Sequence, residues 1–172
     1  MCTLTGDLSR GHGGTMADRT PPAAVLVRPV RREDWTGWQR LWADYHAYGR
    51  HGGSPLPDAV TAGTWERFFQ PEERMEALLA EMDGRLVGFA HIVFHHSTSA
   101  VAPSCLLNDL FVEATLHGQG IGRALVEAVY IRAAAAGARR VYWHVLDTNA
   151  PAVRLYERVA SRSGHVVFRK DL

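Results

Sequence analysis

Hydrophobic and polar positions follow three successive patterns in the first part of the chain. Residues 23–30 form a short run rich in β-branched side chains, which predicts a strand. Over residues 32–49, apolar residues recur at steps of three and four, the period of an amphipathic helix: Trp35, Trp38, Leu41, Trp42 and Tyr45. The proline-rich residues 54–75 carry a second, shorter apolar face, which predicts another helix that Pro71 closes.

The middle of the chain predicts strands. Residues 75–96 contain two apolar segments joined at Asp83 and Gly84, a dipeptide typical of tight hairpin turns, so we expect an antiparallel pair. The residues 97–104 are expected to form a loop. The apolar run at about residues 105–113 predicts a fourth strand.

After a glycine-rich turn, the pattern predicts a helix that ends at Gly137 and has these apolar residues on one side: Ile121, Leu125, Ala128, Val129 and Ala133. A fifth strand is expected at residues 139–147, a fourth helix at residues 149–161 and a last strand at residues 164–170. Strands and helices in this order predict an α/β fold, with a mixed and mostly antiparallel sheet flanked by helices.

One domain, residues 23–172, accounts for all of these elements. Residues 1–22 are rich in Gly, Thr and Asp and have no hydrophobic period, so we expect a disordered extension there.

The composition limits the classes of partner that the chain is expected to bind. The 172 residues are 47% hydrophobic and 22% charged with a net charge of +1, so no basic field favours nucleic acid or an anionic membrane. Cys2 and Cys105 give no disulfide framework, and a reducing cytoplasmic setting is expected. The sequence contains no run of about 18 apolar residues, so no membrane helix is expected. Three histidines, His91, His95 and His96, lie on one strand, but adjacent strand residues point to opposite faces, so no metal is expected.

The glycines at Gly118, Gly120 and Gly122 stand between a strand and a helix, where amide groups and the helix dipole favour an anion. A P-loop requires Gly-Lys-Ser/Thr, whereas Arg123 and Ala124 follow here. A dinucleotide fingerprint requires a third glycine where Arg123 stands. Glycines that only permit close helix packing are a further alternative.

Two segments resemble a known family: residues 108–129, NDLFVEATLHGQGIGRALVEAV, and residues 141–160, VYWHVLDTNAPAVRLYERVA. In this order they resemble the core of the GNAT superfamily of acetyl-coenzyme A (acetyl-CoA) dependent N-acetyltransferases. The family's turn reads Arg/Gln-x-x-Gly-x-Gly/Ala, and HGQGIG matches it at Gly120 and Gly122, with His117 in the Arg/Gln place. The first helix and TWERFFQPEE look like the branch of Hpa-type histone/polyamine and spermidine/spermine acetyltransferases.

The resemblance implies the GNAT fold, in which strands four and five splay apart and four helices flank the sheet. Backbone groups of Leu110, Phe111 and Val112 would then pair with the pantetheine arm of acetyl-CoA. The turn would wrap the pyrophosphate with these residues: His117, Gly118, Gln119, Gly120, Ile121, Gly122 and Arg123. Because a neutral His117 gives less charge to phosphates than arginine, we expect weakened but retained cofactor binding. Asn149 is expected to cap its helix and, by resemblance, to bond the cofactor.

By resemblance, Tyr156 faces the coenzyme sulfur and protonates the departing thiolate, although periodicity alone places it at the rim of the core. Several residues are candidates for the general base that removes the proton from the amine. The branch often has Glu-Asp where this chain has Asn108 and Asp109, and strand alternation predicts that these two side chains point to opposite faces. Glu81, His91 and Asp109 are the candidates, beside a chain of water molecules.

Trp42, Tyr45 and Asn108 are the expected contacts of the acceptor, although aromatic residues at helical spacing are also typical of a core. The resemblance implies direct attack of a primary amine on the thioester in a ternary complex. A non-catalytic module that binds or senses acyl-CoA is the alternative. Because a single strand follows the fourth helix, its exposed edge predicts a homodimer.

Overall fold

The computed structural model describes residues 24–47 and 55–171, so the predicted extension at residues 1–22 lies outside the described residues. Its strands form one sheet in the order β1-β2-β3-β4-β5. Their bounds are β1 Leu26–Pro29, β2 Met75–Met82, β3 Arg85–Ser97, β4 Ala100–Val112 and β5 Val141–Tyr142. The first four strands pair antiparallel and β5 pairs parallel with β4, which confirms the predicted mixed sheet.

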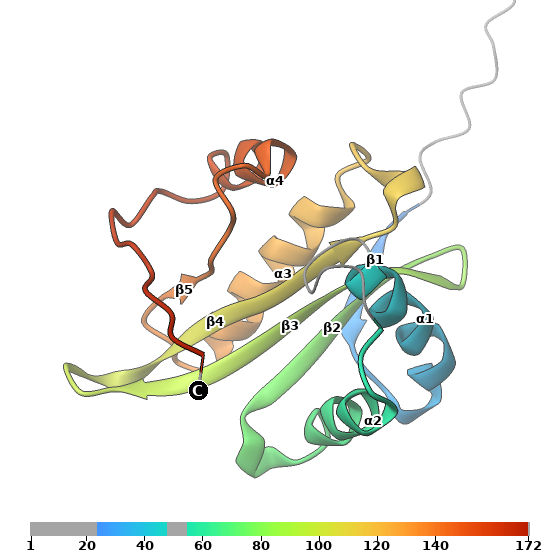
Figure 1. Ribbon diagram of the computed structural model, residues 1–172, viewed down its shortest axis with the longest axis horizontal. Helices are drawn as coiled ribbons and strands as arrows, with labels where there is room; N and C mark the ends of the chain where they lie inside the picture. The colour runs from blue at the N-terminus through green and yellow to red at the C-terminus, as the bar shows by residue number, and fades with distance from the viewer. Residues whose placement is uncertain (1–23, 48–54, 172) are drawn as a thin grey trace, which may run out of the picture.

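Helices cover both faces of the sheet (Figure 1). Their bounds are α1 Trp35–Tyr45, α2 Asp58–Arg67, α3 Ile121–Ala135 and α4 Ala150–Tyr156. Helices α1 and α2 lie on one face over what we call the α1-side core, which includes Trp38, Leu41, Trp65, Leu79 and Phe89. Helix α3 lies on the other face over the α3-side core, which includes Leu107, Ile121, Leu125, Val126 and Val129. The periodic apolar faces predicted for α1 and α3 are therefore the faces that the sheet buries.

The turn between β2 and β3 is the predicted tight hairpin. Met82 pairs with Arg85, and the two residues between them, Asp83 and Gly84, have φ values of 51° and 75°. Positive φ at both central positions is the geometry of a type I′ turn, whose twist matches that of the strands.

The loop expected at residues 97–104 is mostly strand, so that prediction was wrong. β3 continues to Ser97 and β4 begins at Ala100, and these two residues pair across a tight turn. Backbone hydrogen bonds hold such a ribbon together whatever the polarity of its side chains, which is why polar residues did not reveal it.

An extra residue in β4 changes the face on which its side chains lie. His91 of β3 pairs with Asp109, but the next residue, Ile92, pairs with Leu107, so Asn108 forms a β-bulge. The α3-side core takes odd-numbered residues of β4 before the bulge, such as Leu107, and even-numbered ones after it, such as Leu110.

The bulge also corrects one expectation about the site. Asn108 and Asp109 do not point to opposite faces, because the Asn108 amide donates a 2.9 Å hydrogen bond to the Asp109 carboxylate. Strict alternation of side chains fails where one strand carries an extra residue.

The C-terminal elements are shorter than predicted. β5 has two residues instead of residues 139–147, and α4 ends at Tyr156 instead of near residue 161. The strand expected at residues 164–170 is absent, and Phe168 in this segment is 92% exposed. A strand requires a neighbour for its backbone hydrogen bonds, and the two-residue β5 offers little edge to pair with.

Close approach of β3 and β4 requires glycine at position 88. A Cβ atom there would lie 2.6 Å from the Phe111 carbonyl oxygen and 3.4 Å from Leu125 Cδ1. We expect Gly88→Ala to lower the free energy of unfolding by about 3 kcal/mol, because the backbone oxygen cannot move without breaking the strand pairing. Urea denaturation of the purified variant measures this.

Gly63→Ala is the matched control, because nothing lies within 4 Å of the added methyl group within helix α2. This control should gain about 0.5–1 kcal/mol from the reduced backbone entropy of the unfolded chain. A Gly88→Ala protein as stable as the unsubstituted chain would contradict the close approach.

Candidate active site

Strands β4 and β5 separate soon after they meet. Among the described residues they pair only at Cys105 with Val141 and at Leu106 with Tyr142. Residues 107–112 of β4 continue with β3 on one side and no β5 pairing on the other. This is the splayed arrangement expected from the sequence, and it leaves one edge of β4 beside Leu110, Phe111 and Val112.

The glycine turn lies directly beyond this edge. Gly118 and Gly120 have φ values of 81° and 86°, a left-handed conformation that favours glycine, and α3 begins at the next residue, Ile121. No side chain caps the first turn of α3. Its first backbone N–H groups therefore point out of the helix at the positive end of its dipole, an arrangement that suits a phosphate.

His117 lies at the start of this turn but faces back to the strand. Its Nε2 donates a 2.8 Å hydrogen bond to the carbonyl oxygen of Val112, so that nitrogen carries a proton. Arg123, at the other end of the turn, pairs with Glu127 one helical turn along α3 at 2.7 Å. Neither side chain is held over the glycine turn. The groups available to bind an anion at the turn are therefore its backbone amides.

Helix α4 meets the turn at Gly122. A Cβ at Gly122 would lie 3.3 Å from Leu155 Cδ2 and 3.9 Å from Val112 Cγ2, so the end of β4, the start of α3 and α4 converge there. Tyr156 follows Leu155; it is half-buried, and its ring lies 5.0 Å from that of Trp143.

Asn149 caps α4 as predicted. Its side-chain oxygen accepts a 3.3 Å hydrogen bond from the backbone N–H of Ala152. The cap fixes the start of the short helix that presents Tyr156.

Asp109 is the most heavily bonded carboxylate near the bulge. Its side chain accepts hydrogen bonds from the Tyr45 hydroxyl at 2.8 Å and the Asn108 amide at 2.9 Å, with His91 Nδ1 at 3.1 Å. Burial alone raises the pKa of this carboxyl group, but the bonds from His91, Tyr45 and Asn108 outweigh it and lower the pKa to about 2. Asp109 is therefore ionised at neutral pH.

His91 is neutral and has a defined tautomer. Its Nε2 lies 2.9 Å from the indole N–H of Trp38, which can only donate, so Nε2 must accept and the proton lies on Nδ1. Burial lowers the pKa of His91, more strongly than Asp109 raises it. The close pair of His91 and Asp109 is thus a hydrogen bond from a neutral ring to a carboxylate, not an ion pair.

The aromatic residues of α1 form mainly core. Trp38 is fully buried, and Trp42 is 7% exposed and stacks on Tyr45 with 5.6 Å between ring centroids. Tyr45 is half-buried and carries its hydroxyl to Asp109. Of the predicted acceptor contacts, Tyr45 and Asn108 therefore lie beside Asp109, while Trp42 supports Tyr45 from within the core.

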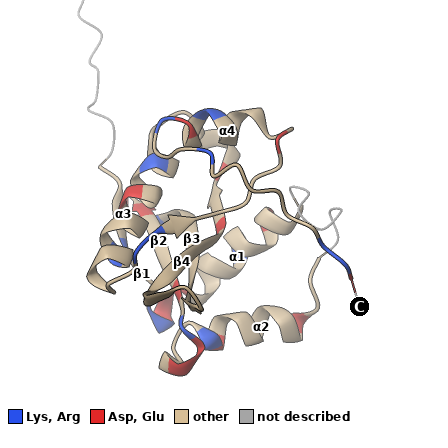
Figure 2. Cartoon of the chain, turned by 90° about the vertical axis from the view of Figure 1, so that its left-hand side faces the viewer, with Lys and Arg blue, Asp and Glu red and all other residues tan. Residues whose placement is uncertain are grey.

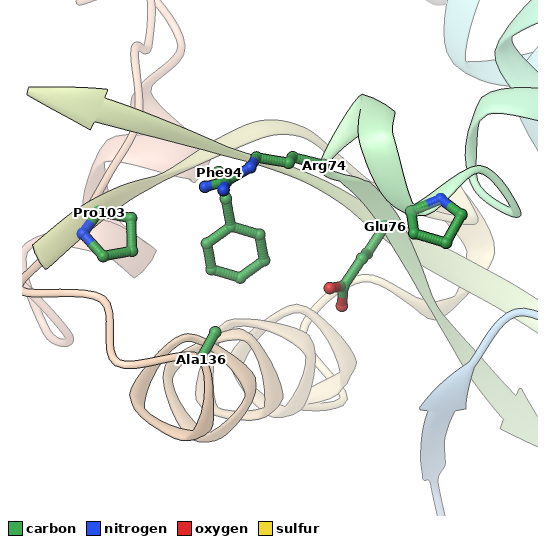
Figure 3. Close-up of a pocket in the computed structure, with 6 residues that line it drawn as sticks. Arg74, Glu76, Phe94, Pro103 and Ala136 are labelled. Atoms are coloured by element: carbon green, nitrogen blue, oxygen red, sulfur yellow. The ribbon is translucent and has the colours of Figure 1, made fainter.

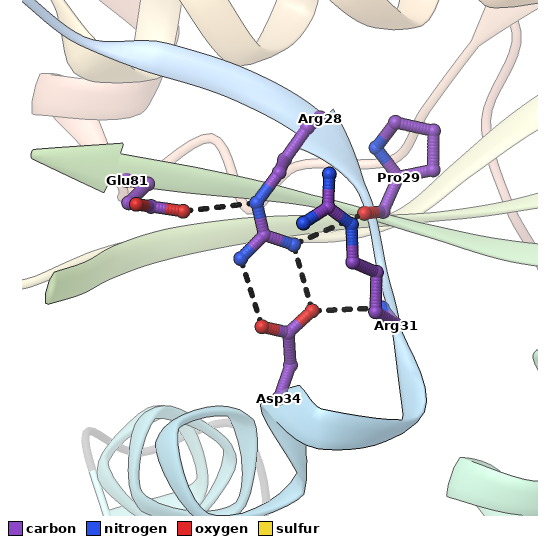
Figure 4. Close-up of polar contacts among 5 residues, drawn as sticks. All are labelled: Arg28, Pro29, Arg31, Asp34 and Glu81. Atoms are coloured by element: carbon purple, nitrogen blue, oxygen red, sulfur yellow. Dashed lines mark hydrogen bonds and ion pairs between the residues drawn. The ribbon is translucent and has the colours of Figure 1, made fainter. Parts of the chain in front are cut away.

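Glu81 belongs to a different set of polar contacts, which Figure 4 shows together with Arg28 and Asp34. Its carboxylate accepts a 2.9 Å bond from Arg28, whose guanidinium also makes two bonds of 2.7 and 2.8 Å to Asp34. The positions on β3 that pair with Glu81 and Asp109 are five residues apart, roughly 16 Å along the strand. The structure thus does not bring Glu81 and Asp109 together, and Glu81 instead ties β2 to β1.

Sequence reasoning missed Glu113, which anchors the end of β4. Its carboxylate is buried and is bound by Arg40 and, at 2.7 Å, by Arg85. Arg40 also donates to the Leu86 carbonyl oxygen at 2.9 Å. The one signal in the sequence was an acidic residue shortly before the glycine turn that has no role in the family pattern.

Cys105 is fully buried in β4, and burial raises the pKa of its thiol to about 11, so it is a core residue as predicted. Among the residues that the structure describes, no group of three or more His, Cys, Asp or Glu side chains has an arrangement suited to a metal ion. Within those same ranges, no helix is long and apolar enough to cross a membrane. Figure 2 shows acidic and basic positions interspersed along the chain.

A hollow of about 160 Å³ lies at the opposite end of α3 (Figure 3). Phe94, Pro103 and Ala136 line it together with Arg74 and Glu76. The length of α3, about 22 Å for its 15 residues, separates it from the glycine turn. It is not part of the site described above.

Comparison with known proteins agrees with this geometry. Residues 35–160 match the Acetyltransferase (GNAT) family. The D-amino-acid N-acetyltransferase HPA3 of Saccharomyces cerevisiae is 30% identical over 149 residues, which cover 86% of this chain and 91% of that protein. A mycothiol acetyltransferase of Acidothermus cellulolyticus is 33% identical over 159 residues, but this chain covers only 46% of its length.

Solved structures show the same fold. The aminoglycoside acetyltransferase meta-AAC0020 from an uncultured soil metagenomic sample, in complex with sisomicin, superposes with a TM-score of 0.74 at 17% identity over 86% of this chain and 96% of that one. AAC(6')-Iy, in complex with the bisubstrate analog CoA-S-monomethyl-acetylneamine, gives 0.74 at 18% identity over 87% and 99%.

A mixed sheet with splayed strands and a glycine turn at a helix start defines an acyltransferase of the N-acetyltransferase class. The chain belongs to the GNAT acetyltransferase family, whose members use acetyl-CoA.

The neutral state of His91 predicts a loss of stability in mild acid. A histidine whose pKa is lowered by folding stays neutral in the native state, whereas the unfolded chain binds a proton below pH 6.5. The free energy of unfolding should therefore fall as the pH drops below 6.5, with a contribution of up to about 1.4 kcal/mol per pH unit from His91. Urea denaturation at about pH 7 and pH 5 measures it.

His91→Phe removes this titration and is the comparison. The difference in stability between the unsubstituted chain and this variant should shrink toward acid pH, because only the unsubstituted chain carries the penalty. A difference that stays constant between these two pH values would show that His91 does not stay neutral in the fold.

Proposed function

We propose that this protein transfers an acetyl group from acetyl-CoA to a primary amine by direct attack in a ternary complex. The observation that carries the proposal is the convergence at Gly122 of the unpaired edge of β4, the glycine turn and α4 with Tyr156. The name of the yeast relative, a D-amino-acid N-acetyltransferase, supports an amine as the acceptor.

Three parts of the site would hold the coenzyme. Backbone groups of Leu110, Phe111 and Val112 would pair with the pantetheine arm along the β4 edge. The amides of residues 118–123 would bind the pyrophosphate, where the space beside Gly118 and Gly120 is open. Asn149 would border the coenzyme from the start of α4. When bound, acetyl-CoA supplies a thioester carbonyl for the amine to attack.

The chain supplies proton transfer and charge stabilisation. As the amine nitrogen bonds to the carbonyl carbon and the C–S bond breaks, the Tyr156 hydroxyl gives its proton to the leaving thiolate. The backbone N–H of Phe111 at the β4 edge would stabilise the negative charge that develops on the carbonyl oxygen. The amine loses its ammonium proton to water before it attacks. After attack the nitrogen loses a second proton to water and Tyr156 regains one, so the protons balance.

Two measurements test the function. Release of thiol from acetyl-CoA is followed across polyamines, lysine derivatives, amino acids and amine antibiotics, with a control that has no acceptor. Thermal stabilisation by coenzyme A is measured in parallel. Release with one class of amine supports catalysis; stabilisation without release from any amine would instead support a module that binds acyl-CoA.

Tyr156→Phe should lower turnover by about 100-fold while coenzyme A affinity changes little, because the ring remains and only the acidic proton is lost. Steady-state kinetics and calorimetric titration measure the two effects.

Tyr130→Phe is the matched control, since it removes a hydroxyl that donates to the Val159 carbonyl oxygen on the same side of the sheet. It should leave turnover unchanged. Equal turnover in the Tyr156 variant would remove Tyr156 as the proton donor.

The exposed C-terminal segment supports a further proposal, that two copies associate as a homodimer. Val166 and Val167 are 76% and 66% exposed, beside Phe168, and β5 lies at the edge of the sheet. Packing of this segment against the same segment of the other copy would remove these apolar side chains from water. Light scattering should give twice the 19.0 kDa mass of one chain.

Phe168→Asp should shift this protein to monomers, because a charge in the pairing segment costs desolvation. Val101→Asp places the same change on a fully exposed hairpin residue and should leave the dimer intact. A monomeric unsubstituted protein would contradict the proposal.

A further inference from the structure

Trp38, His91 and Asp109 form a chain of hydrogen bonds that runs from the core to the β4 bulge. The Trp38 indole donates to His91 Nε2 at 2.9 Å, and His91 Nδ1 lies 3.1 Å from the carboxylate of Asp109. His91 is 2% exposed and Trp38 is fully buried. A buried chain with this directionality fixes the orientation of the group at its end.

The surroundings of His91 hold the ring in one place. It stacks on Phe89 with ring centroids 4.3 Å apart and lies 4.7 Å from the ring of Phe68. If the imidazole were protonated, Nε2–H would face the indole N–H and two donors would oppose each other. The ring is therefore confined to the neutral form that donates to Asp109.

Asp109 and Tyr156 are directed toward opposite faces of the sheet. Tyr156 packs on the α3-side core, whereas the partners of Asp109, His91 and Tyr45, pack with the α1-side core. A thioester placed between the splayed strands would have Tyr156 on one side of the sheet and Asp109 on the other. The attacking nitrogen and the leaving sulfur are separate substituents of the carbonyl carbon, so different groups of the protein can act on each of them.

We propose that His91, held by Trp38, is a positioning residue for Asp109, and that this fixed carboxylate stabilises the positive charge that develops on the attacking amine nitrogen. The inference rests on the proposed function. It assigns to Asp109 an electrostatic role instead of the role of proton acceptor, and to His91 a role through Asp109 alone.

The pKa values of the groups involved support an electrostatic role for Asp109 instead of the role of proton acceptor. An alkylamine has a pKa of about 10.4, whereas the hydrogen bonds to Asp109 hold the pKa of its carboxyl group below the usual range, so Asp109 is a poor acceptor for the proton of the amine. His91 has its Nε2 occupied by Trp38 and cannot accept the proton there. The other titratable groups around Asp109 are Tyr45 of α1, which already donates to it, and His46, whose ring lies 5.1 Å from that of Tyr45. The amine therefore loses its proton to water.

Nuclear magnetic resonance of the ring nitrogens tests the positioning without any substrate. The expected result is one neutral tautomer of His91, protonated at Nδ1, from about pH 5 to pH 9. Trp38→Phe should allow His91 to change tautomer or to titrate in this range. An Nε2-protonated or titrating His91 in the unsubstituted protein would overturn the proposal.

Kinetics test the catalytic part. His91→Phe and Trp38→Phe should each lower kcat by about tenfold or more with KM within about threefold, since the lost interaction acts on the transition state. His91→Asn, whose amide can donate to Asp109 in place of Nδ1–H, should recover most of the loss. Trp65→Phe is the control for the tryptophan change, because Trp65 packs 5.0 Å from Trp38 in the same core. It should leave kcat unchanged.

The pH profile separates the two roles of Asp109. Log kcat/KM should rise with pH up to the pKa of each amine used, so the inflection moves from one amine to another. An inflection at one pH for all amines that disappears in Asp109→Asn would show that Asp109 accepts the proton and would overturn the proposal. Failure of the unsubstituted protein to acetylate any amine would overturn the proposed function and the catalytic role, while the tautomer result would still decide the positioning.

Discussion

The extra residue at Asn108 is the constraint on which the site depends. The bulge reverses the facing of β4 halfway along the strand, so residues on both sides of it contribute to the same α3-side core with opposite parity. It places Asn108 and Asp109 side by side, with Asp109 opposite His91. β4 continues past the bulge without β5, so the altered half of the strand is also the half whose backbone edge is available.

Several contacts hold the strands around this edge of β4 in place. Gly88 lets β3 approach the Phe111 carbonyl closely, and Glu113 holds the end of β4 through Arg40 and Arg85. Arg28 joins β1, β2 and the turn before α1 through Glu81 and Asp34. The contacts at Gly88 and Glu113 fix the strand that carries the site, and those of Arg28 fix the other end of the sheet. The site itself consists of backbone amides and a few polar side chains.

Much of the fold could be predicted from periodicity, because the helices α1 and α3 and the Asp83 to Gly84 turn each have strong local patterns. The bulge could not, since both faces of β4 are apolar and an extra residue leaves no mark in the hydrophobic pattern. The strand expected at residues 164–170 has suitable composition, but pairing depends on an edge that the short β5 does not provide. The bond from Trp38 to His91 joins residues 53 positions apart, so only the tertiary structure reveals it.

Amide chemical shifts during a titration with coenzyme A test the central claim most directly, namely that the coenzyme lies along the β4 edge and the glycine turn. The account predicts that the largest shifts occur at Leu110, Phe111 and Val112 and at residues 118–123, with little change at Ala136 beside the far hollow. Shifts centred on that hollow, or no shifts at the turn, would contradict the account.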